Sequence, residues 1–409
     1  MSIELRPVTE EEFPKAVRSL EDGFGFHADE DNTADMLSRT ELDRTLCAFD
    51  GDELVATAGA YTFDLTLPGG TTAPAAGVTF VTVKATHRRR GILTSIMAEQ
   101  LDDVADRGEP LALLTASESL IYPRFGYGMG AFGSDWRIDT DHGALRYPPQ
   151  VEGRIRLVDA GDVTEHAPRL HDATRLRTPG AVTRSESWWT SWFKDPPHMR
   201  NGASKRWYLL HESPSGEIDG FCAYRRRSKY EHGFSRDVAI LDQVFGESDA
   251  IEHAFIAYLL DKDLIHAVEA HGRPVEDPFR WRLADVRRMQ TTDVVDNLWV
   301  RVVDPCAALS ARRYGTDDTL VVEIDDPFRP ATSGRYRIRG GPESAECTAT
   351  DDPADLAMDV ADLGTIYLGG VAPSSLHRVG RISEVTPGAV ARADAFFLST
   401  PAPWMTTGF

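Results

Sequence analysis

The stretch that decides the fold reads Val81-Thr82-Val83-Lys84-Ala85-Thr86-His87-Arg88-Arg89-Arg90-Gly91-Ile92-Leu93. The apolar residues of 78–83 predict a buried strand that ends at Val83. Beyond the basic loop, apolar side chains recur at helical spacing, and these are Ile92, Leu93, Ile96, Met97, Leu101 and Val104. Gly108 and Pro110 follow, as glycine and proline commonly do where a helix ends. The sequence therefore predicts a strand, a loop and an amphipathic helix in direct succession.

The loop between this strand and this helix has the chemistry of a phosphate-binding site. The first turn of a helix carries amide donors without intrahelical partners, together with the positive end of the helix dipole. Gly91 lacks the Cβ that would hinder a diphosphate, and Arg88, Arg89 and Arg90 add positive charge. This loop has neither a GxxxxGKS/T nor a GxGxxG pattern, which argues against nucleotide hydrolysis and dinucleotide binding at this site. By itself the loop is also compatible with a basic surface turn, although the phosphate site is the favoured interpretation.

The whole chain reads as three segments of a mixed α/β protein, with predicted domains at 1–148, 149–290 and 291–409. The first two segments look like diverged copies of one plan: a strand and a helix, then a hairpin, then an apolar strand before an amphipathic helix. In the second copy the apolar strand is 238–244 and the helix is 251–260. The third segment, which we expect to open with a strand at 298–303, reads as a separate α+β unit.

The second copy lacks the basic loop of the first. At the corresponding place it has Phe245-Gly246-Glu247-Ser248-Asp249, whose two acids would repel a diphosphate. We therefore expect one active site per chain, in the first copy.

Composition narrows the classes of partner. The chain has 44 basic and 64 acidic residues, a formal net charge of −20, which disfavours nucleic acid and anionic membranes and attracts cations. The excess of acid is also explained by solubility alone. No apolar run is long enough to span a membrane and the first residues do not resemble a signal peptide. The four cysteines and twelve histidines show no metal-ligand spacing, so we expect a cytoplasmic protein without a metal.

Two motifs give the sequence a family resemblance. The pattern V-x-V-x-x-x-x-R-R-x-G-I at 81–92 resembles the acetyl-CoA signature of the GCN5-related N-acetyltransferases, the GNAT superfamily. The stretch from Ala116-Ser117-Glu118 to Ile121-Tyr122-Pro123-Arg124-Phe125-Gly126-Tyr127-Gly128 resembles a signature of the Eis (enhanced intracellular survival) family of acetyltransferases. The resemblance extends over essentially the whole chain. It implies tandem GNAT-like domains followed by a sterol-carrier-protein-like domain.

The resemblance also implies roles for particular residues. Tyr122 takes the place of the general acid, and the carboxylate of the terminal residue Phe409 lies in the active site and handles the incoming amine. Tyr127 is expected only to pack. The aromatic walls of the acceptor pocket would be Phe24, Phe26 and Phe80, for which core packing is an equally good interpretation. The predicted acetyl-CoA contacts are Phe80, Val81, Thr82, Val83, Arg88, Arg89, Arg90, Gly91, Ile92, Leu93, Thr94, Ser117 and Glu118.

The expected reaction is direct transfer of an acetyl group from acetyl-CoA to a primary amine. No GxSxG or comparable nucleophile context supports a covalent enzyme intermediate. The resemblance implies aminoglycosides as acceptors, a link to antibiotic resistance, and a homohexamer. Two alternatives stay open: an acetyltransferase for a protein lysine or a polyamine, and a lipid-binding or scaffold protein that uses the third domain.

Overall fold

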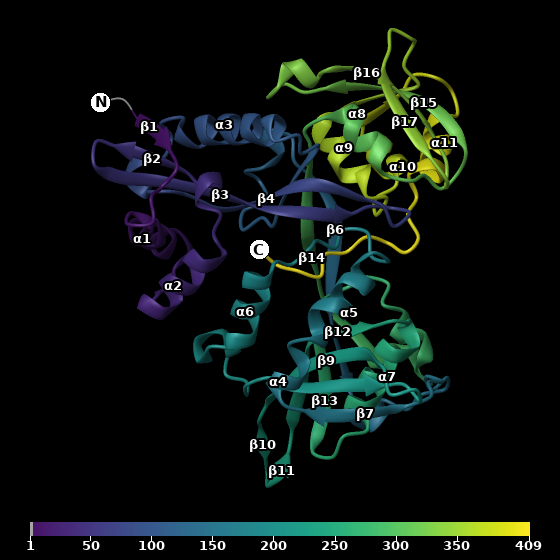
Figure 1. Cartoon of the computed structure of the whole chain (residues 1–409). Helices are drawn as coiled ribbons and strands as arrows, with labels where there is room; N and C mark the ends of the chain where they lie inside the picture. Colours follow the sequence, from purple (N-terminus) through teal and green to yellow (C-terminus); the bar gives the residue numbers. More distant parts are fainter. Residues whose placement is uncertain (1–2) are drawn as a thin grey trace. The chain divides into compact units, whose positions relative to one another are not determined.

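The structure, a computed structural model, describes residues 3–409; the first two residues of the predicted domain 1–148 lie outside this range. It consists of two compact units, which are described separately (Figure 1). One unit holds the described residues up to Ala131 together with Pro179–Val182 and Asp296–Phe409. The other holds Phe132–Thr178 and Thr183–Val295. The first unit therefore combines the first and third segments of the sequence.

The sheet of the first unit has the order β1-β2-β3-β4-β5-β14. Its strands are β1 (Ile3–Arg6), β2 (Leu46–Asp50), β3 (Glu53–Thr66), β4 (Thr72–Val83), β5 (Leu111–Leu114) and β14 (Met289–Val302), which begins in the second unit. Strands β3 and β4 form a long antiparallel pair, whereas β4 and β5 run parallel. A parallel pair needs a crossover, and the predicted helix, α3 (Ile92–Asp106), supplies it.

Helices cover both faces of this sheet (Figure 1). The apolar side of α3 is buried against β4 and β5 through Met97, Leu101 and Val104, as its sequence spacing predicts. The helix α1 (Phe13–Phe24) packs on β3 and β4 and is followed by α2 (Glu30–Arg39). The helices α1 and α3 each bury an apolar stripe against the strands that form the site, whereas α2 has no fully buried residue.

The strand at 298–303 was predicted to open the third segment, but it does not belong to the sheet of that segment. Residues Trp299–Val302 of β14 pair antiparallel with Leu111–Leu114 of β5 and so belong to the sheet of the first segment. Local patterning identified the strand, but the identity of its partner depends on contacts nearly two hundred residues apart in sequence. Position in the chain was a poor guide to sheet membership here.

The rest of the first unit is a five-stranded sheet with the order β17-β16-β15-β18-β19. Its strands are β15 (Asp318–Asp325), β16 (Gly334–Gly340), β17 (Ala345–Ala349), β18 (Leu356–Asp359) and β19 (Ile382–Glu384). Its helices are α8 (Pro305–Ala311), α9 (Val360–Tyr367), α10 (Pro373–His377) and α11 (Ala389–Phe397). The helices α8 and α11 pack on this sheet, which confirms the α+β reading of the segment.

The second unit repeats the plan of the first sheet, with the order β6-β13-β12-β9-β8-β7. Its strands are β6 (Gly128–Asp139), which begins in the first unit, β7 (Arg154–Val158), β8 (Trp207–Glu212), β9 (Ile218–Arg227), β12 (Asp237–Gly246) and β13 (Ile265–Arg273). A small hairpin joins β10 (Tyr230–Glu231) and β11 (Phe234–Ser235). The helices are α4 (Ala160–Val163), α5 (His166–Arg175), α6 (Glu186–Lys194) and α7 (Asp249–Leu260). As in the first copy, a helix, α7, connects two parallel strands, here β12 and β13.

Within residues 3–409, no helix has the length and apolar character that crossing a bilayer requires.

Candidate active site

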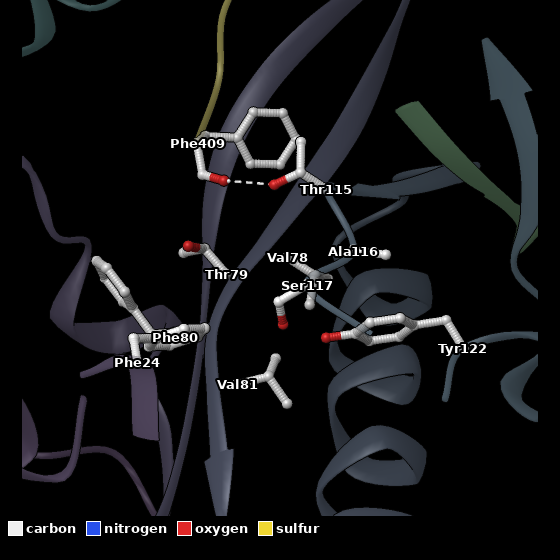
Figure 2. A pocket seen from close by; sticks show the side chains of 10 residues that line it. All are labelled: Phe24, Val78, Thr79, Phe80, Val81, Thr115, Ala116, Ser117, Tyr122 and Phe409. Carbon is white, nitrogen blue, oxygen red and sulfur yellow. Dashed lines mark hydrogen bonds between the residues drawn. The ribbon is translucent and has the colours of Figure 1, made fainter. Parts of the chain in front are cut away.

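The parallel strands β4 and β5 separate after a short stretch of pairing. They are hydrogen-bonded only where Ala75–Gly77 faces Leu111–Leu113. Beyond this point, a cavity of about 270 Å³ opens between the two strands (Figure 2). It is lined by Phe24, Val78, Thr79, Phe80, Val81, Thr115, Ala116, Ser117, Tyr122 and Phe409. The separation exposes backbone of β4 that a regular sheet would cover.

Strand β4 has a β-bulge where it lines the cavity. Thr79 pairs with Gly59 and Thr82 with Thr57, so that both Phe80 and Val81 face the single residue Ala58. Phe80 has a φ of 58°, a left-handed conformation that is unusual for a residue with a side chain. A bulge leaves its extra residue out of the ladder. The two residues of the bulge, Phe80 and Val81, both line the cavity.

Tyr122 lies at the end of the turn that follows β5. Its side chain is buried, packs edge-on against Tyr127 with 6.0 Å between ring centroids, and directs its hydroxyl into the cavity beside Ser117 (Figure 2). Burial, and then the negative charge of Glu118, raise the pKa of Tyr122 above its usual value. The hydroxyl is therefore protonated at neutral pH and available as a proton donor. Tyr127 is fully buried, which confirms its packing role.

The chain terminus reaches the same cavity. The hydroxyl of Thr115 donates a hydrogen bond of 3.0 Å to a terminal oxygen of Phe409, and the Phe409 ring packs on Phe63 with 5.0 Å between centroids (Figure 2). Upstream, the Trp404 amide donates to the Pro179 carbonyl. Chain ends usually fray, but this one is held by side chains and backbone over its last six residues, as its aromatic and proline content predicts.

The basic loop lies at the start of α3 and is open to solvent. Gly91 is the residue preceding the helix, with φ 80°, and no side chain caps the first turn. A Cβ on Gly91 would meet no heavy atom within 4 Å. Arg90 lies 3.5 Å from Asp50, Arg88 contacts the Val83 carbonyl, and Arg89 is exposed. The amide donors and the cationic side chains are thus accessible to an anionic group, which is what a diphosphate requires.

Eight of the thirteen predicted cofactor residues lie either at the cavity or at the exposed loop and first turn of α3. Phe80, Val81 and Ser117 line the cavity, and Arg88, Arg89, Arg90, Gly91 and Thr94 lie at the exposed loop and first turn of α3. Other predicted side chains face elsewhere: Ile92 is in the core, Val83 and Leu93 pack against it, Thr82 is buried, and Glu118 is exposed outside the cavity lining. Contacts of these last residues with a cofactor through the backbone stay a prediction.

Two of the three predicted acceptor-pocket aromatics line the cavity. Phe24 and Phe80 do so, whereas Phe26 is outside the lining and 37% exposed. The carboxylates near them also serve the backbone. Glu21 accepts a hydrogen bond from the Ala28 amide, and Asp29 caps α2 by accepting from the Asn32 amide. Both remain sources of negative charge close to Phe24 in sequence.

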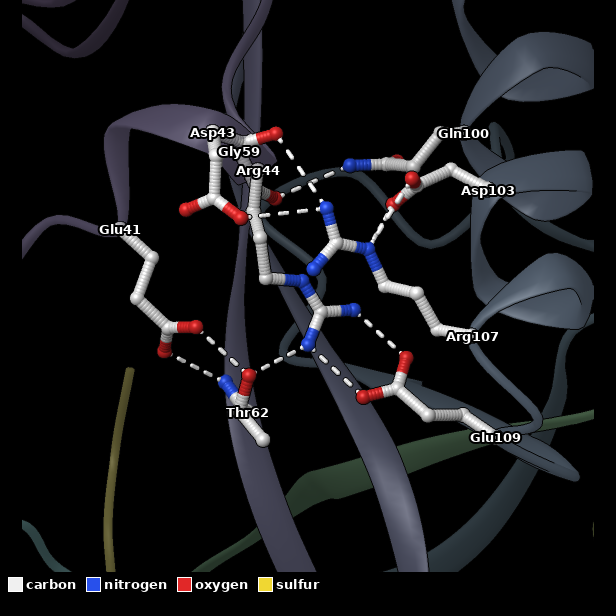
Figure 3. Close-up of polar contacts among 9 residues, drawn as sticks. All are labelled: Glu41, Asp43, Arg44, Gly59, Thr62, Gln100, Asp103, Arg107 and Glu109. Atoms are coloured by element: carbon white, nitrogen blue, oxygen red, sulfur yellow. Dashed lines mark hydrogen bonds and ion pairs between the residues drawn. The ribbon is translucent and has the colours of Figure 1, made fainter.

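A buried polar network contacts β3 at Thr62 and Gly59 (Figure 3). Arg44 and Glu109 form a bidentate ion pair with distances of 2.7 and 2.6 Å, and Arg44 also donates to the Thr62 hydroxyl. Closer to the bulge, the Gln100 amide of α3 donates a 3.0 Å hydrogen bond to the Gly59 carbonyl. The Arg44–Glu109 pair offsets part of the cost of burying its two charges, and the Gln100–Gly59 hydrogen bond links α3 to β3.

The sequence analysis missed several residues of the site. Val78, Thr79, Thr115 and Ala116 all line the cavity, and Thr115 binds the terminal carboxylate. A polar residue directly after a buried parallel strand was a usable signal, since ligands commonly bind at the carboxyl ends of such strands. Its partner, Phe409, could not be read from local sequence. In the described residues, no group of three or more His, Cys, Asp or Glu side chains could hold a metal ion.

The fold and the cavity correspond to known families of acetyltransferases. Residues 4–130 and 180–302 each match an acetyltransferase (GNAT) domain family, and residues 305–406 match the sterol carrier protein domain. These matches confirm the predicted fold class: two GNAT domains followed by a sterol-carrier-protein-like domain. They define the chain as a GNAT-type enzyme, and acetyl-CoA use is what this fold implies.

Comparison with similar proteins identifies the family of the chain more specifically. It is 40% identical over 371 residues to an uncharacterized N-acetyltransferase of Streptomyces avermitilis, which covers 90% of each chain. It is 31% identical over 353 residues to N-acetyltransferase Eis of Mycobacterium tuberculosis, covering 85% of this chain and 84% of that one. The crystal structure of Eis1 from Mycobacterium abscessus superposes with a TM-score of 0.88 at 33% identity, covering 99% of this chain and 100% of that one. The chain belongs to the Eis family of N-acetyltransferases.

Proposed function

We propose that this N-acetyltransferase moves the acetyl group of acetyl-CoA to primary amines of aminoglycoside-type polycations, in the cavity between β4 and β5. The observation that carries the proposal is the convergence of three groups on one cavity. These are the Tyr122 hydroxyl, the terminal carboxylate of Phe409, and the bulged backbone at Phe80 (Figure 2). They are, respectively, a proton donor, an anion suited to an ammonium group, and a source of polarising amides.

In the proposed reaction, this chain's groups act on an amine that attacks the thioester carbon directly. The new C–N bond forms as the C–S bond breaks, the amine loses one proton and the departing sulfur gains one. A thiol has a pKa of about 8.5 and a tyrosine about 10, so protonated Tyr122 can supply that proton as charge develops on sulfur. Amides at the bulge would stabilise the charge on the thioester oxygen.

The terminal carboxylate of Phe409 is proposed to orient the substrate amine. An α-carboxyl group ordinarily has a pKa of about 3.3–3.7, so it is a weak base toward an amine. Its negative charge next to the cavity nonetheless attracts an ammonium group and can relay its proton to water. The hydrogen bond from Thr115 fixes the carboxylate for this task. The aromatic walls Phe24 and Phe80 would contact the apolar face of the acceptor.

We also propose a location, a class of partner and an oligomeric state for the whole protein. The four cysteines are free thiols, consistent with a reducing, cytoplasmic location. The excess of negative charge favours polycations over nucleic acid or anionic membranes as partners. Eis resemblance is the basis for proposing a homohexamer and a role in antibiotic resistance. The alternative acceptors, protein lysines and polyamines, share the amine chemistry, while a lipid-binding role of the third domain would need no intact β4–α3 loop.

The proposal is tested by thiol release from acetyl-CoA with a panel of aminoglycosides, polyamines and lysine peptides. The key variant carries one extra glycine after Phe409, which keeps the ring but moves the carboxylate by a residue. We expect kcat for aminoglycosides to fall roughly 100-fold, since misplaced groups lose most of the benefit of proximity.

The matched control adds the same glycine before Met1, far in sequence from the terminal carboxylate. Wild-type activity of the C-terminally extended chain would show that the carboxylate is only structural. Turnover of polyamines or lysine peptides with no turnover of aminoglycosides would replace the proposed acceptor class, and thiol release with none of the three classes would overturn the proposed function.

A further inference from the structure

Three buried hydroxyl groups, from α1, β4 and β3, form a chain of contacts that lies outside the lining of the active-site cavity. Ser19 on α1 contacts Thr82 on β4 at 3.2 Å, and Thr82 contacts Thr57 on β3 at 2.8 Å. Thr57 then donates a 2.6 Å hydrogen bond to the Phe80 carbonyl. All three side chains are nearly inaccessible to solvent. The chain ends on the residue that forms the active-site bulge.

The direction of these hydrogen bonds follows from proton counting. Each hydroxyl has one proton to donate. The proton of Thr57 goes to the Phe80 carbonyl, so Thr57 must accept from Thr82, and Thr82 in turn accepts from Ser19. A series that runs one way polarises each successive group, so the bond at the carbonyl end is strengthened.

The group that receives this chain is in an unfavourable conformation. Phe80 has φ 58°, and the left-handed region is energetically unfavourable for a residue with a side chain. Its carbonyl has left the regular ladder at the bulge, and a buried carbonyl without a donor would add a further cost. Gly59 leaves room for the Phe80 ring, since a Cβ there would lie 3.1 Å from the ring. Thr57 and Gly59 thus stabilise the bulge from the neighbouring strand.

The same hydroxyl chain connects the bulge with the helix that carries part of the acceptor wall. A Cβ on Gly23 would come within 2.6 Å of the Thr82 methyl group, so α1 lies directly on Thr82. Phe24, the next residue, lines the cavity. The position of this wall and the conformation of β4 are therefore fixed by one set of contacts.

We infer that Thr57 and Thr82 are positioning residues for acetyl transfer. They hold the Phe80 carbonyl toward β3, on the edge of β4 opposite β5, so that the amides of the bulge are left for the thioester, and through Ser19 they connect α1 to this geometry. None of the three hydroxyls lines the cavity, so each acts through Phe80. The inference rests on the proposed function, and it adds a second layer of residues to that site.

The experiment compares Thr57→Val, which removes the hydroxyl at nearly constant volume, with Thr57→Ser, which restores it. We expect Thr57→Val to lower kcat at least tenfold with a smaller change in KM for the acceptor amine, and Thr57→Ser to recover most of the loss. Amide hydrogen exchange in peptides that cover 78–84 should become roughly tenfold faster in Thr57→Val alone. Thr365→Val is the matched control, because Thr365 is also buried and donates to a backbone carbonyl, that of Ala361, within a helix.

Several results would overturn the inference. They are a kcat for Thr57→Val equal to that of wild type, a loss of kcat no larger than in Thr365→Val, or a loss of kcat without faster exchange at 78–84. Failure of the proposed function is distinguishable, since wild type would then release no thiol with any amine. In that case exchange at 78–84 still decides whether the hydroxyls hold the bulge: faster exchange in Thr57→Val supports it, and unchanged exchange refutes it.

Discussion

The start of α3 in the first GNAT copy and the start of α7 in the second are the same structural element with opposite chemistry. At α3 the preceding residue is Gly91, no side chain caps the helix, and the surrounding charges are basic. At α7 the Ser248 hydroxyl accepts from the Ile251 amide, and a carboxylate oxygen of Glu252 accepts from the Gly246 amide at 3.3 Å. No side chain caps the first turn of α3, whereas at α7 the Ile251 amide already has a side-chain acceptor.

Arginines enlarge this difference. In the first copy the arginines lie exposed beside an uncapped helix start, whereas in the second copy arginines form hydrogen bonds and an ion pair with the loop itself. Arg177 donates to the Gly246 and Glu247 carbonyls at 2.6 and 2.7 Å, and Arg169 pairs with the Glu247 carboxylate at 3.1 Å. A phosphate binds a helix start only if the donors there lack an internal partner. Duplication of a fold therefore preserves its topology without preserving its ligand site.

The largest effect should come from Tyr122→Phe, which keeps the ring and removes the proton donor. If the second copy has no cofactor site, nothing in the chain can replace Tyr122, and kcat should fall roughly 10²- to 10⁴-fold. The dissociation constant for acetyl-CoA, measured by calorimetry, should stay within about threefold, because the phosphate loop is untouched. Residual turnover near that of wild type would mean that another group, or the second copy, supplies the proton.

A smaller effect is expected from Arg89→Glu, which gives the first loop the acidic character of the second. The substitution reverses a charge next to the open helix start and should weaken acetyl-CoA binding roughly tenfold, and less at high salt. Arg378→Glu, an equal charge change at an exposed arginine after α10, is the control. If both variants bound acetyl-CoA equally, net charge rather than the loop would govern affinity.

Glu252→Gln in the second loop should leave acetylation activity unchanged and should alter only the pH dependence of stability. Burial raises the pKa of Glu252 to about 7, against the opposing influence of Arg273 and Arg177 and with added repulsion from Asp249. Between its ordinary pKa of about 4.5 and pH 7, the native state holds a proton that the unfolded chain has lost. Stability of the wild type should therefore fall as pH rises through this window, by at most on the order of 3 kcal/mol.

Glu252→Gln should be free of this loss, because its amide oxygen can still accept from Gly246 and never ionises. Urea unfolding at pH 5 and pH 8 measures the difference, with Glu217→Gln, at an exposed carboxylate of the same copy, as the control. Parallel pH dependence in wild type and Glu252→Gln would show that Glu252 is ionised in the native state. A loss of acetylation in Glu252→Gln would contradict the view that the second copy has no catalytic role.

Much of the first site followed from sequence because its signals are local. A strand, a glycine-bearing basic loop and an apolar helical repeat within 78–105 predict a phosphate-binding turn from periodicity and backbone chemistry. The position of Tyr122 came from family resemblance in the turn after β5. The bulge at Phe80 was not predictable in this way, because its contacts are with residues of another strand, the Thr57 hydroxyl and the close-packed Gly59.

The sequence by itself determined the order of strands and helices, the duplicated plan, the open loop before α3 and its acidic counterpart before α7. These depend on side-chain period and on residues next to one another in the chain. Only the tertiary structure decided that β14 joins β5, that three hydroxyls from α1, β3 and β4 meet behind Phe80, and that Thr115 binds the carboxylate of Phe409, 294 residues later. The physical reason is that such contacts are selected by the packing of the whole chain, in which closure of a long loop leaves no local trace.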